Sequence, residues 1–403
     1  NNVNRVLHKN ELCGPAKNLL SDSEYKYKKG YACSGRTIGD YDLDKNDCVD
    51  KCKETNSCKC VTYFPQKSTK KCRLESGTKA TFRGKNVPYF AHVLADNIDN
   101  NIGYPKCKKE GDTLCIQPTS MVRDALKRGM ELEQELGFNP MDLGMIGSSD
   151  THNSNPGDTE EWDYRGVSNV VAPAMVRIDE NTHIPQYINN PGGLAAIWAR
   201  ENTRDDLFEA MENKEVYATS GTRIELRFFG GFNYSESLLS SNEQINFAYE
   251  NGSPMGSTIE HNQDKAPSFF ISAKKDPIDA PLDKIQIIKG WMENGKAKEE
   301  VMDVVCSESR KINDNSKRCK SSNIKVNLKT CAIDQDRGAD ELKVLWTDED
   351  YSPDQNAFYY ARVIQNPTCR WTTYDSLRTG QKISKAYSST MAEMAWSSPI
   401  WIK

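Results

Sequence analysis

The residues best suited to chemistry are an aspartate and a histidine separated by one residue. Asp150 and His152 follow directly after an apolar run at 141–147. A carboxylate oxygen and an imidazole nitrogen are both ligands of divalent zinc, manganese and iron. Alternate side chains of an extended segment point to the same side, so this pair can turn toward one cation. We therefore predict that Asp150 and His152 bind a divalent metal ion (zinc, manganese or iron).

Other candidate donors follow later in the sequence. Glu201 takes the corresponding place after the next predicted strand, and we expect it to assist catalysis beside the metal. The loop between the two strands contains four more residues that could complete or support the site: Glu160, Glu161, Asp163 and His183. A three-residue Asp-x-His pattern is frequent by chance. The residues alone therefore leave open that Asp150 caps a turn beside a surface histidine.

Other residue groups point less clearly to chemistry. Ser149, Asp150 and His152 are too crowded on one loop to act as nucleophile, orienting acid and base. The glycine pairs 192–193 and 230–231 lack a phosphate-loop pattern, so we expect turns there. Four arginines could hold an anionic substrate, although solvation is the default: Arg177, Arg200, Arg204 and Arg223. Five tryptophans in or beside predicted strands are expected to pack in the core rather than to bind carbohydrate: Trp291, Trp346, Trp371, Trp396 and Trp401.

The elements that would position the acid–histidine pair alternate between helix and strand. Apolar residues recur at helical spacing over 122–136, and Gly137 supplies the stop. We expect strands at 141–147 and 192–199, and a helix that begins after Thr203 with Asp206 completing a capping box. A helix, a strand and a polar loop in this order are typical of an α/β unit.

Beyond Ser220 the apolar period changes to two. Alternating residues occur at 224–228, 285–287 and 342–346, each near glycine, proline, asparagine or aspartate. Short strands spaced in this way predict an antiparallel sandwich.

The cysteines indicate disulfides. Nine of the 13 lie at or before Cys115 and the other four at or after Cys306. There is no pair of CxxC knuckles, so we favour disulfides over zinc and expect a secreted protein. The start at Asn1 is consistent with a processed product, and sequons at Asn233 and, more weakly, Asn251 are compatible with a secreted glycoprotein. Because the number of cysteines, 13, is odd, we expect one thiol to be free or linked to another chain.

The amino-terminal part is polar, rich in lysine and dense in cysteine. Cys48 and Cys52 would share one face of a helix, and 61–64 has the composition of a strand. With Cys33, Cys58 and Cys72, this spacing resembles the PAN/apple module over about residues 25–95. The resemblance implies disulfides Cys48–Cys72 and Cys52–Cys58, and a protein or carbohydrate ligand for the module.

Composition excludes two classes of partner. The chain has 53 Lys and Arg against 57 Asp and Glu, without the basic excess that nucleic-acid binding requires. A membrane-spanning helix needs ~20 consecutive apolar residues. The longest weakly polar stretch, 167–176, contains Ser168, Asn169 and Pro173. We therefore expect no nucleic-acid partner and no membrane span.

The remaining motifs resemble one family when taken in order. They are Met121 to Gly129, Met145 to Asn153, Gly192 to Arg204, Lys214 to Arg223, Arg370 to Asp375 and Ala395 to Trp401. Over residues 118–403 they resemble the family of domain of unknown function 3604, allied to the PHP (polymerase and histidinol phosphatase) metallohydrolases. The resemblance implies an α+β multidomain protein: a PAN/apple-like module at 1–105, the carboxy-terminal part of a PHP-type α/β barrel at 106–221, and an antiparallel β-sandwich-like domain at 222–403. It also places Asp150 and His152 on the last metal-ligand motif of the barrel.

The sequence departs from this family at the start of the barrel. PHP-type barrels open with His-x-His, but no two of the five histidines here have that spacing. We therefore expect a secreted metal-dependent hydrolase component for phosphoesters or related esters, with a second chain supplying the first half of the barrel. Metal-bound water would be its nucleophile. The alternative is a non-catalytic extracellular binding or structural protein with a degenerate barrel.

Overall fold

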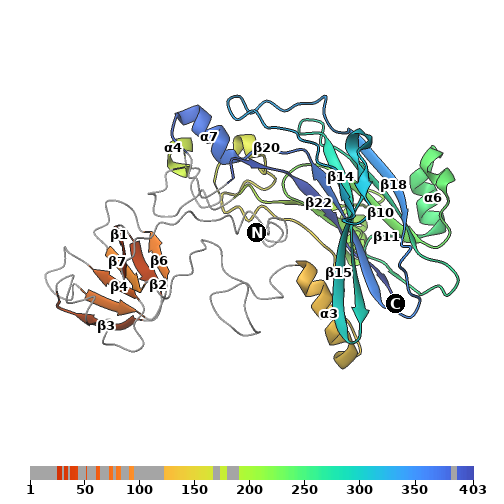
Figure 1. Ribbon diagram of the computed structural model, residues 1–403, viewed down its shortest axis with the longest axis horizontal. Coiled ribbons are helices and arrows are strands. Elements are labelled where there is room, and N and C mark those ends of the chain that lie inside the picture. Colours follow the sequence, from red (N-terminus) through yellow and green to blue (C-terminus); the bar gives the residue numbers. More distant parts are fainter. Residues whose placement is uncertain are drawn as a thin grey trace.

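The computed structural model describes most of the chain beyond residue 121. The described residues are 122–166, 173–178, 190–382 and 388–403, together with strands between 25 and 94, residues 42–43 and residue 51 (Figure 1). They form a mixed α and β structure with several sheets and a few helices. No described helix has the length and apolar character needed to cross a bilayer.

The amino-terminal strands form a small antiparallel sheet. Its strand order is β1 (Tyr25–Lys29), β7 (Phe90–Leu94), β4 (Cys60–Tyr63), β5 (Cys72–Glu75) and β3 (Thr37–Tyr41). A separate pair joins β2 (Tyr31–Ser34) to β6 (Lys79–Phe82). Strand β4 confirms the strand predicted at 61–64. Cys72 is fully buried and disulfide-bonded. Its partner, the Cys52–Cys58 pairing and the helix predicted around Cys48 lie outside the described residues.

The helix predicted at 122–136 is confirmed as α3 (Val122–Leu136). Gly137 ends it with φ of 76° and donates its N–H to the Glu133 carbonyl at 2.9 Å. The strand predicted at 141–147 is wrong, because this segment is not part of any sheet ladder. Its end lies along β8 (Leu194–Ile197), where the Gly147 N–H reaches the Leu194 carbonyl at 3.2 Å. A second bond runs from the Gly193 N–H to the Ser148 carbonyl at 2.9 Å. These two hydrogen bonds are too few to form a strand.

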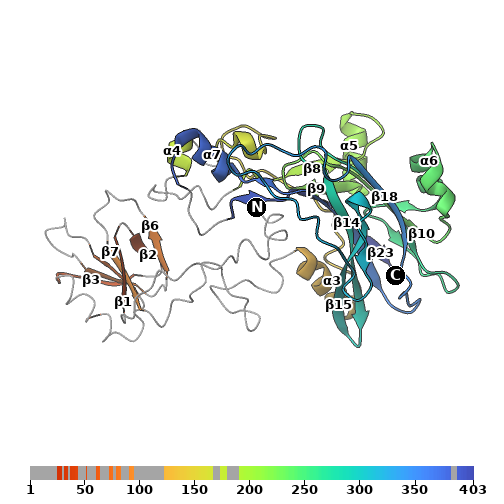
Figure 2. The same ribbon diagram turned by 45° about the horizontal axis from the view of Figure 1, so that its top comes forward.

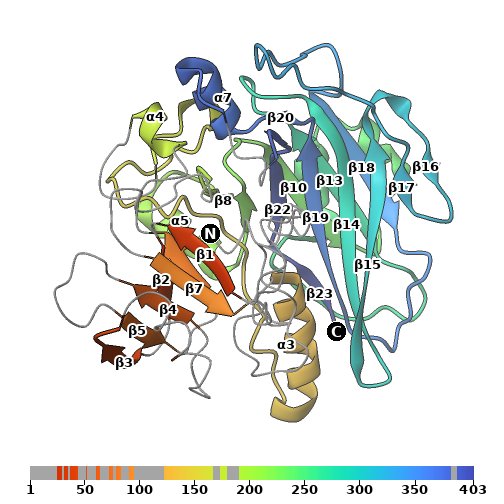
Figure 3. The same cartoon turned by 60° about the vertical axis from the view of Figure 1, so that its left-hand side comes forward.

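The largest sheet has eight strands. Its main path runs β12 (Thr258–Ile259), β23 (Ile400–Ile402), β19 (Ala357–Gln365), β22 (Met394–Ser397), β9 (Val216–Thr219) and β8. The long hairpin of β14 (Leu282–Glu293) and β15 (Lys296–Cys306) joins through β19 (Figure 3). β8 and β9 are antiparallel, and β9 pairs with β22. The sheet therefore continues across the predicted boundary at residue 221, and the described residues contain no closed barrel.

A second sheet packs face to face against the first. Its order is β11 (Ser253–Pro254), β10 (Glu225–Gly231), β13 (Ser268–Lys274) and β18 (Glu341–Thr347). Strands β10 and β18 confirm two of the three expected positions, and the third, 285–287, lies in β14 of the larger sheet. Phe228 and Ile271 from this sheet meet Ile285, Tyr359 and Val363 from the larger one, all at most 1% exposed. Residues alternate along each strand, so every second side chain enters this core.

Helices cover the outer faces of both sheets. Leu126 and Met130 of α3 pack against Tyr360 and Trp396 on the outer face of the larger sheet (Figure 1). Helix α6 (Gln244–Asn251) and η5 (Glu236–Ser240) cover the outer face of the smaller sheet. Helix α5 (Arg204–Glu212) lies near β8 and β9 (Figure 2), and its cap is confirmed, since Thr203 accepts the Asp206 N–H at 3.2 Å. Three predicted core tryptophans are at most 2% exposed, namely Trp371, Trp396 and Trp401.

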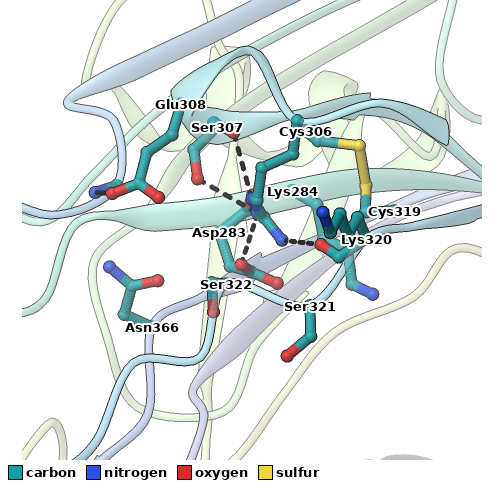
Figure 4. Close-up of polar contacts among 12 residues, drawn as sticks. Asp283, Lys284, Cys306, Ser307, Glu308, Cys319, Lys320, Ser321, Ser322 and Asn366 are labelled. Carbon is teal, nitrogen blue, oxygen red and sulfur yellow. Dashed lines mark hydrogen bonds and ion pairs between the residues drawn. A yellow bond between two sulfur atoms is a disulfide. The ribbon is translucent and has the colours of Figure 1, made fainter.

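One arginine and one disulfide fix the lobe that follows β15. Cys306 is bonded to Cys319 in β17 (Arg318–Cys319), which pairs with β16 (Ile312–Asn313) (Figure 4). The Arg310 guanidinium donates to the Lys320 carbonyl at 2.7 Å and to the Asp283 carboxylate at 2.6 Å. A second disulfide joins Cys331 to Cys369 in β20 (Thr368–Cys369). These bonds confirm that the late cysteines form disulfides.

Candidate functional site

Asp150 and His152 lie on an exposed loop beside the start of β8. Both side chains are exposed. Asp150 has φ of 55°, in the left-handed region that aspartate tolerates better than most residues. Asn153 closes the loop, because its Nδ2 donates to the Gly166 carbonyl at 2.8 Å. The two side chains therefore lie at the surface of a turn and not along an extended segment, and their metal binding stays a prediction.

A pair of glycines lets this loop approach the sheet. A β-carbon on Gly192 would lie 2.4 Å from the Ser149 Cα, and one on Gly193 would lie 2.3 Å from the Thr219 carbonyl oxygen. Gly192 also has φ of 91°, which disfavours any residue with a side chain. The glycine pair thus serves close backbone packing beneath Asp150.

Glu201 lies at the other end of β8. The loop of Asp150 contacts Gly192, before the strand starts, whereas Glu201 follows after the strand ends at Ile197. A four-residue strand spans about 13 Å, so the described structure does not bring Glu201 and Asp150 together. Glu201 is exposed. Its predicted role beside the metal stays a prediction.

The acidic residues after His152 each make a structural contact. In η3 (Glu161–Asp163), the buried Glu161 carboxylate accepts a hydrogen bond from the backbone N–H of Trp371 at 2.5 Å. Glu160 pairs with Arg223 at 2.7 Å, and Asp163 pairs with Arg165 at 2.6 Å. The bonds of Glu161 and Glu160 tie this segment to distant parts of the fold, whereas the Asp163–Arg165 pair is local. His183 lies outside the described residues.

A buried ion pair joins this region to the carboxy-terminal part of the chain. Arg177 in α4 (Ala174–Arg177) donates two hydrogen bonds of 2.9 Å to Asp375 in α7 (Trp371–Thr379), and Figure 3 shows the two helices side by side. Tyr164 packs on Trp371 with ring centroids 4.6 Å apart, and burial raises the pKa of Tyr164. Buried charges require paired partners, so α4 and α7 have one well-defined arrangement.

Sequence reasoning missed a second buried polar contact between distant parts of the chain. Ser220, which follows β9, donates its hydroxyl to the Glu393 carboxylate, and both residues are at most 3% exposed. Their separation in the sequence, 173 residues, hides the contact. The motif from Lys214 to Arg223 contains Ser220, but no sequence signal pairs this residue with Glu393.

A small acidic cavity lies between the loop and the sheet corner. Its volume of about 10 Å³ leaves room for one water molecule at most, so it is no substrate pocket. Five carboxylates line it: Glu160, Glu161, Asp276, Asp279 and Glu393. Burial raises the pKa of Asp279, although the Ala280 N–H, which donates at 2.7 Å, lowers it in part.

Within the described part of the chain, these donors do not assemble a metal site. No group of three or more histidine, cysteine, aspartate or glutamate side chains there has a geometry that could hold a metal ion. Asp150 and His152 supply suitable ligand atoms, but a structural or catalytic zinc takes at least three protein ligands. The predicted pair is therefore an incomplete ligand set.

Three of the four arginines considered for substrate binding are engaged in ion pairs. Arg177 binds Asp375, and Arg223 binds Glu160. Arg200 pairs with Glu209 at 2.8 Å. Their positive charges are thus balanced within the fold.

Comparison with protein-family models gives two matches. Residues 96–403 match the model described as Protein of unknown function (DUF3604), and residues 22–98 match the PAN domain. Comparisons with curated proteins and with solved structures returned no match.

Proposed function

Because this chain belongs to the family described as Protein of unknown function (DUF3604), we propose that it is a component of a secreted, PHP-like metal-dependent hydrolase. Its substrate would be a phosphoester or a related ester. Asp150 and His152 would contribute two metal ligands, and a second chain would contribute the others. The observation that carries the proposal is the exposure of both side chains on one loop.

Buried charged residues in and against the segment that follows the loop support a functional role. Glu161, Arg177 and Asp375 are buried charged residues, between 1% and 7% exposed. Replacing buried charged groups by apolar residues is often neutral or stabilising. Stability alone therefore does not explain why these residues are charged. Their effect is to fix one arrangement of the segments that follow Asp150 and His152. A metal ligand pair needs this kind of support.

Exposed apolar residues beside the loop support a second chain. Leu143 is 60% exposed and Ile146 is 56% exposed, and both precede Asp150 on the same segment. On the same segment, the Asp142 carboxylate pairs with Lys214 Nζ at 2.6 Å. The Lys214 N–H in turn reaches the carbonyl of Met211, whose side chain is 47% exposed. Clustered exposed apolar side chains mark interaction surfaces. The first half of a barrel, supplied by another chain, would cover them.

The proposal predicts a specific loss of metal. Protein purified from its source without chelator should contain metal that Asp150→Asn and His152→Gln variants lose, as measured by elemental analysis after gel filtration. His261→Gln is the matched control, because His261 bonds Tyr351 at 3.2 Å and Asn356 at 3.1 Å elsewhere in the fold. Equal metal content in all four proteins would contradict the proposal.

One observation favours the alternative of a non-catalytic binding protein. The described residues hold no complete ligand set, and the amino-terminal part matches the PAN domain. Under this alternative the PAN domain would bind a protein or carbohydrate partner and the rest would be a scaffold. Metal-free protein that still captures a partner through residues 22–98 would favour it.

A further inference from the structure

We infer that Asn233 carries an N-linked glycan and that Asn251, the other sequon asparagine, does not. Both asparagines satisfy the Asn-x-Ser pattern, as Asn233-Tyr234-Ser235 and Asn251-Gly252-Ser253. The chain contains disulfides, which is consistent with the compartment where such glycans are added. The two sites differ in structure.

The Asn233 site is an open turn between β10 and η5. Asn233 and Ser235 are both exposed. The Asn233 Oδ1 accepts a hydrogen bond from Lys265 Nζ at 2.8 Å. The carboxamide is therefore held through its oxygen, and this contact does not involve Nδ2. The nitrogen that would carry the sugar is thus not the atom used in this contact. A glycan here leaves the Lys265 bond intact.

The Asn251 site is closed by the fold. Asn251 is the last residue of α6 and is half-buried, and its Nδ2 donates to the Phe247 carbonyl at 2.9 Å. The following Gly252 has its Cα so close to β10 that an added β-carbon would lie 2.6 Å from the Gly230 carbonyl oxygen. Ser253 is paired with Gly230 in the β10–β11 ladder. A sugar on Nδ2 would replace one of its two hydrogens and would have to fit beside the Phe247 carbonyl and the closely packed Gly252.

The modification itself is a simple group transfer. The Nδ2 of Asn233 forms a bond to C1 of a sugar that is carried on a lipid pyrophosphate. The bond between C1 and the phosphate oxygen breaks, the lipid pyrophosphate leaves, and Nδ2 loses one proton. The product is an amide-linked glycan on the face that α6 and η5 cover. Figure 1 shows α6 on the opposite side of the molecule from α4 and α7.

The test uses the full chain with a cleavable signal peptide, secreted from animal cells. Digestion with a peptide amidase that removes N-glycans in heavy-oxygen water labels each formerly glycosylated asparagine as an aspartate, which peptide mass spectrometry locates. We expect the label on Asn233 and none on Asn251. Asn233→Gln and Ser235→Ala should each abolish the glycan, whereas Asn251→Gln should leave the glycoprotein mass shift unchanged.

Two results would overturn the inference. The first is secreted wild-type protein with no label at Asn233. The second is a label on Asn251 in wild-type protein. Secretion of the Asn251→Gln variant with intact disulfides shows that the comparison is between folded proteins.

Discussion

At the scale of single residues, the clearest feature is the contrast between exposed candidate ligands and buried charges beside them. Asp150 and His152 face solvent, whereas Arg177 and Asp375 form an ion pair that is at most 8% exposed. The Arg177 guanidinium donates two hydrogen bonds to the Asp375 carboxylate. Its role is to hold α4 against α7.

Replacing Arg177 tests that role. Arg177→Met removes one ion-pair partner of the buried Asp375 carboxylate and leaves the pair with Arg378 at 3.0 Å. We expect a loss of about 3–5 kcal/mol in the free energy of unfolding, the usual cost of breaking a buried pair. Arg165→Met, which breaks an exposed pair, should cost about 0–1 kcal/mol. Urea unfolding monitored by tryptophan fluorescence measures both, and equal losses would refute the structural role.

Asp279 provides a test by pH. Burial raises the pKa of this carboxyl in the native state, so the native state holds the proton more tightly than the unfolded state does. The resulting stabilisation is complete below the unfolded pKa of about 3.9 and is lost as pH rises through the native pKa. Asp279→Asn cannot ionise and avoids this loss. Its stability relative to wild type should therefore increase as pH rises from acid to neutral, and a difference independent of pH would contradict the assignment.

At the scale of elements, sequence patterns located those that depend on local signals. The helix at 122–136 and the cap at Thr203 followed from apolar spacing and capping residues. The strand expected at 141–147 did not form, because strand formation depends on a partner that local sequence does not specify. For the same reason the pairing of β9 with β22, far apart in sequence, could not be predicted. The candidate pair Asp150 and His152 came from a motif, but the buried contact of Ser220 with Glu393 came only from the fold.

The close approach of the Asp150 loop to the sheet can be tested at Gly192. Gly192→Ala adds a β-carbon 2.4 Å from the Ser149 Cα at a φ of 91°. Gly157→Ala is the matched control, with φ of 82° and no atom within 4 Å of the added carbon. Backbone strain alone should lower the free energy of unfolding of the control by about 1–2 kcal/mol. We expect a clearly larger loss for Gly192→Ala in the same urea titration, and equal losses would show that the loop does not pack there.

At the scale of the whole molecule, the described residues beyond 121 form two packed sheets with helices on their outer faces, and β8 is an edge strand of the larger sheet. The segment bonded along this edge contains the exposed Leu143 and Ile146 and leads into the candidate metal ligands, whereas α6 and the turn of Asn233 belong to the outer face of the smaller sheet. A partner chain would therefore bind at the edge and leave the glycan in solvent.

Disulfides contribute to the stability of the whole molecule. The Cys306–Cys319 bond closes a loop with a sequence separation of 13. The free energy of unfolding of a Cys306→Ser, Cys319→Ser double variant should be lower by about 3 kcal/mol. Without the disulfide the unfolded chain has more conformational entropy, which favours the unfolded state. Denaturant unfolding under oxidising conditions measures this. The two proteins should converge after reduction, and a difference that persists in reductant would point to packing instead.

The central claim is that Asp150 and His152 belong to a metal site completed by a second chain. Native mass spectrometry of the protein from its source, without chelator and before and after reduction, tests it most directly. The account predicts a heavier assembly that contains divalent metal and a second polypeptide with a His-x-His sequence. A metal-free mass of this chain alone would contradict it and would favour a binding protein that acts through its PAN domain.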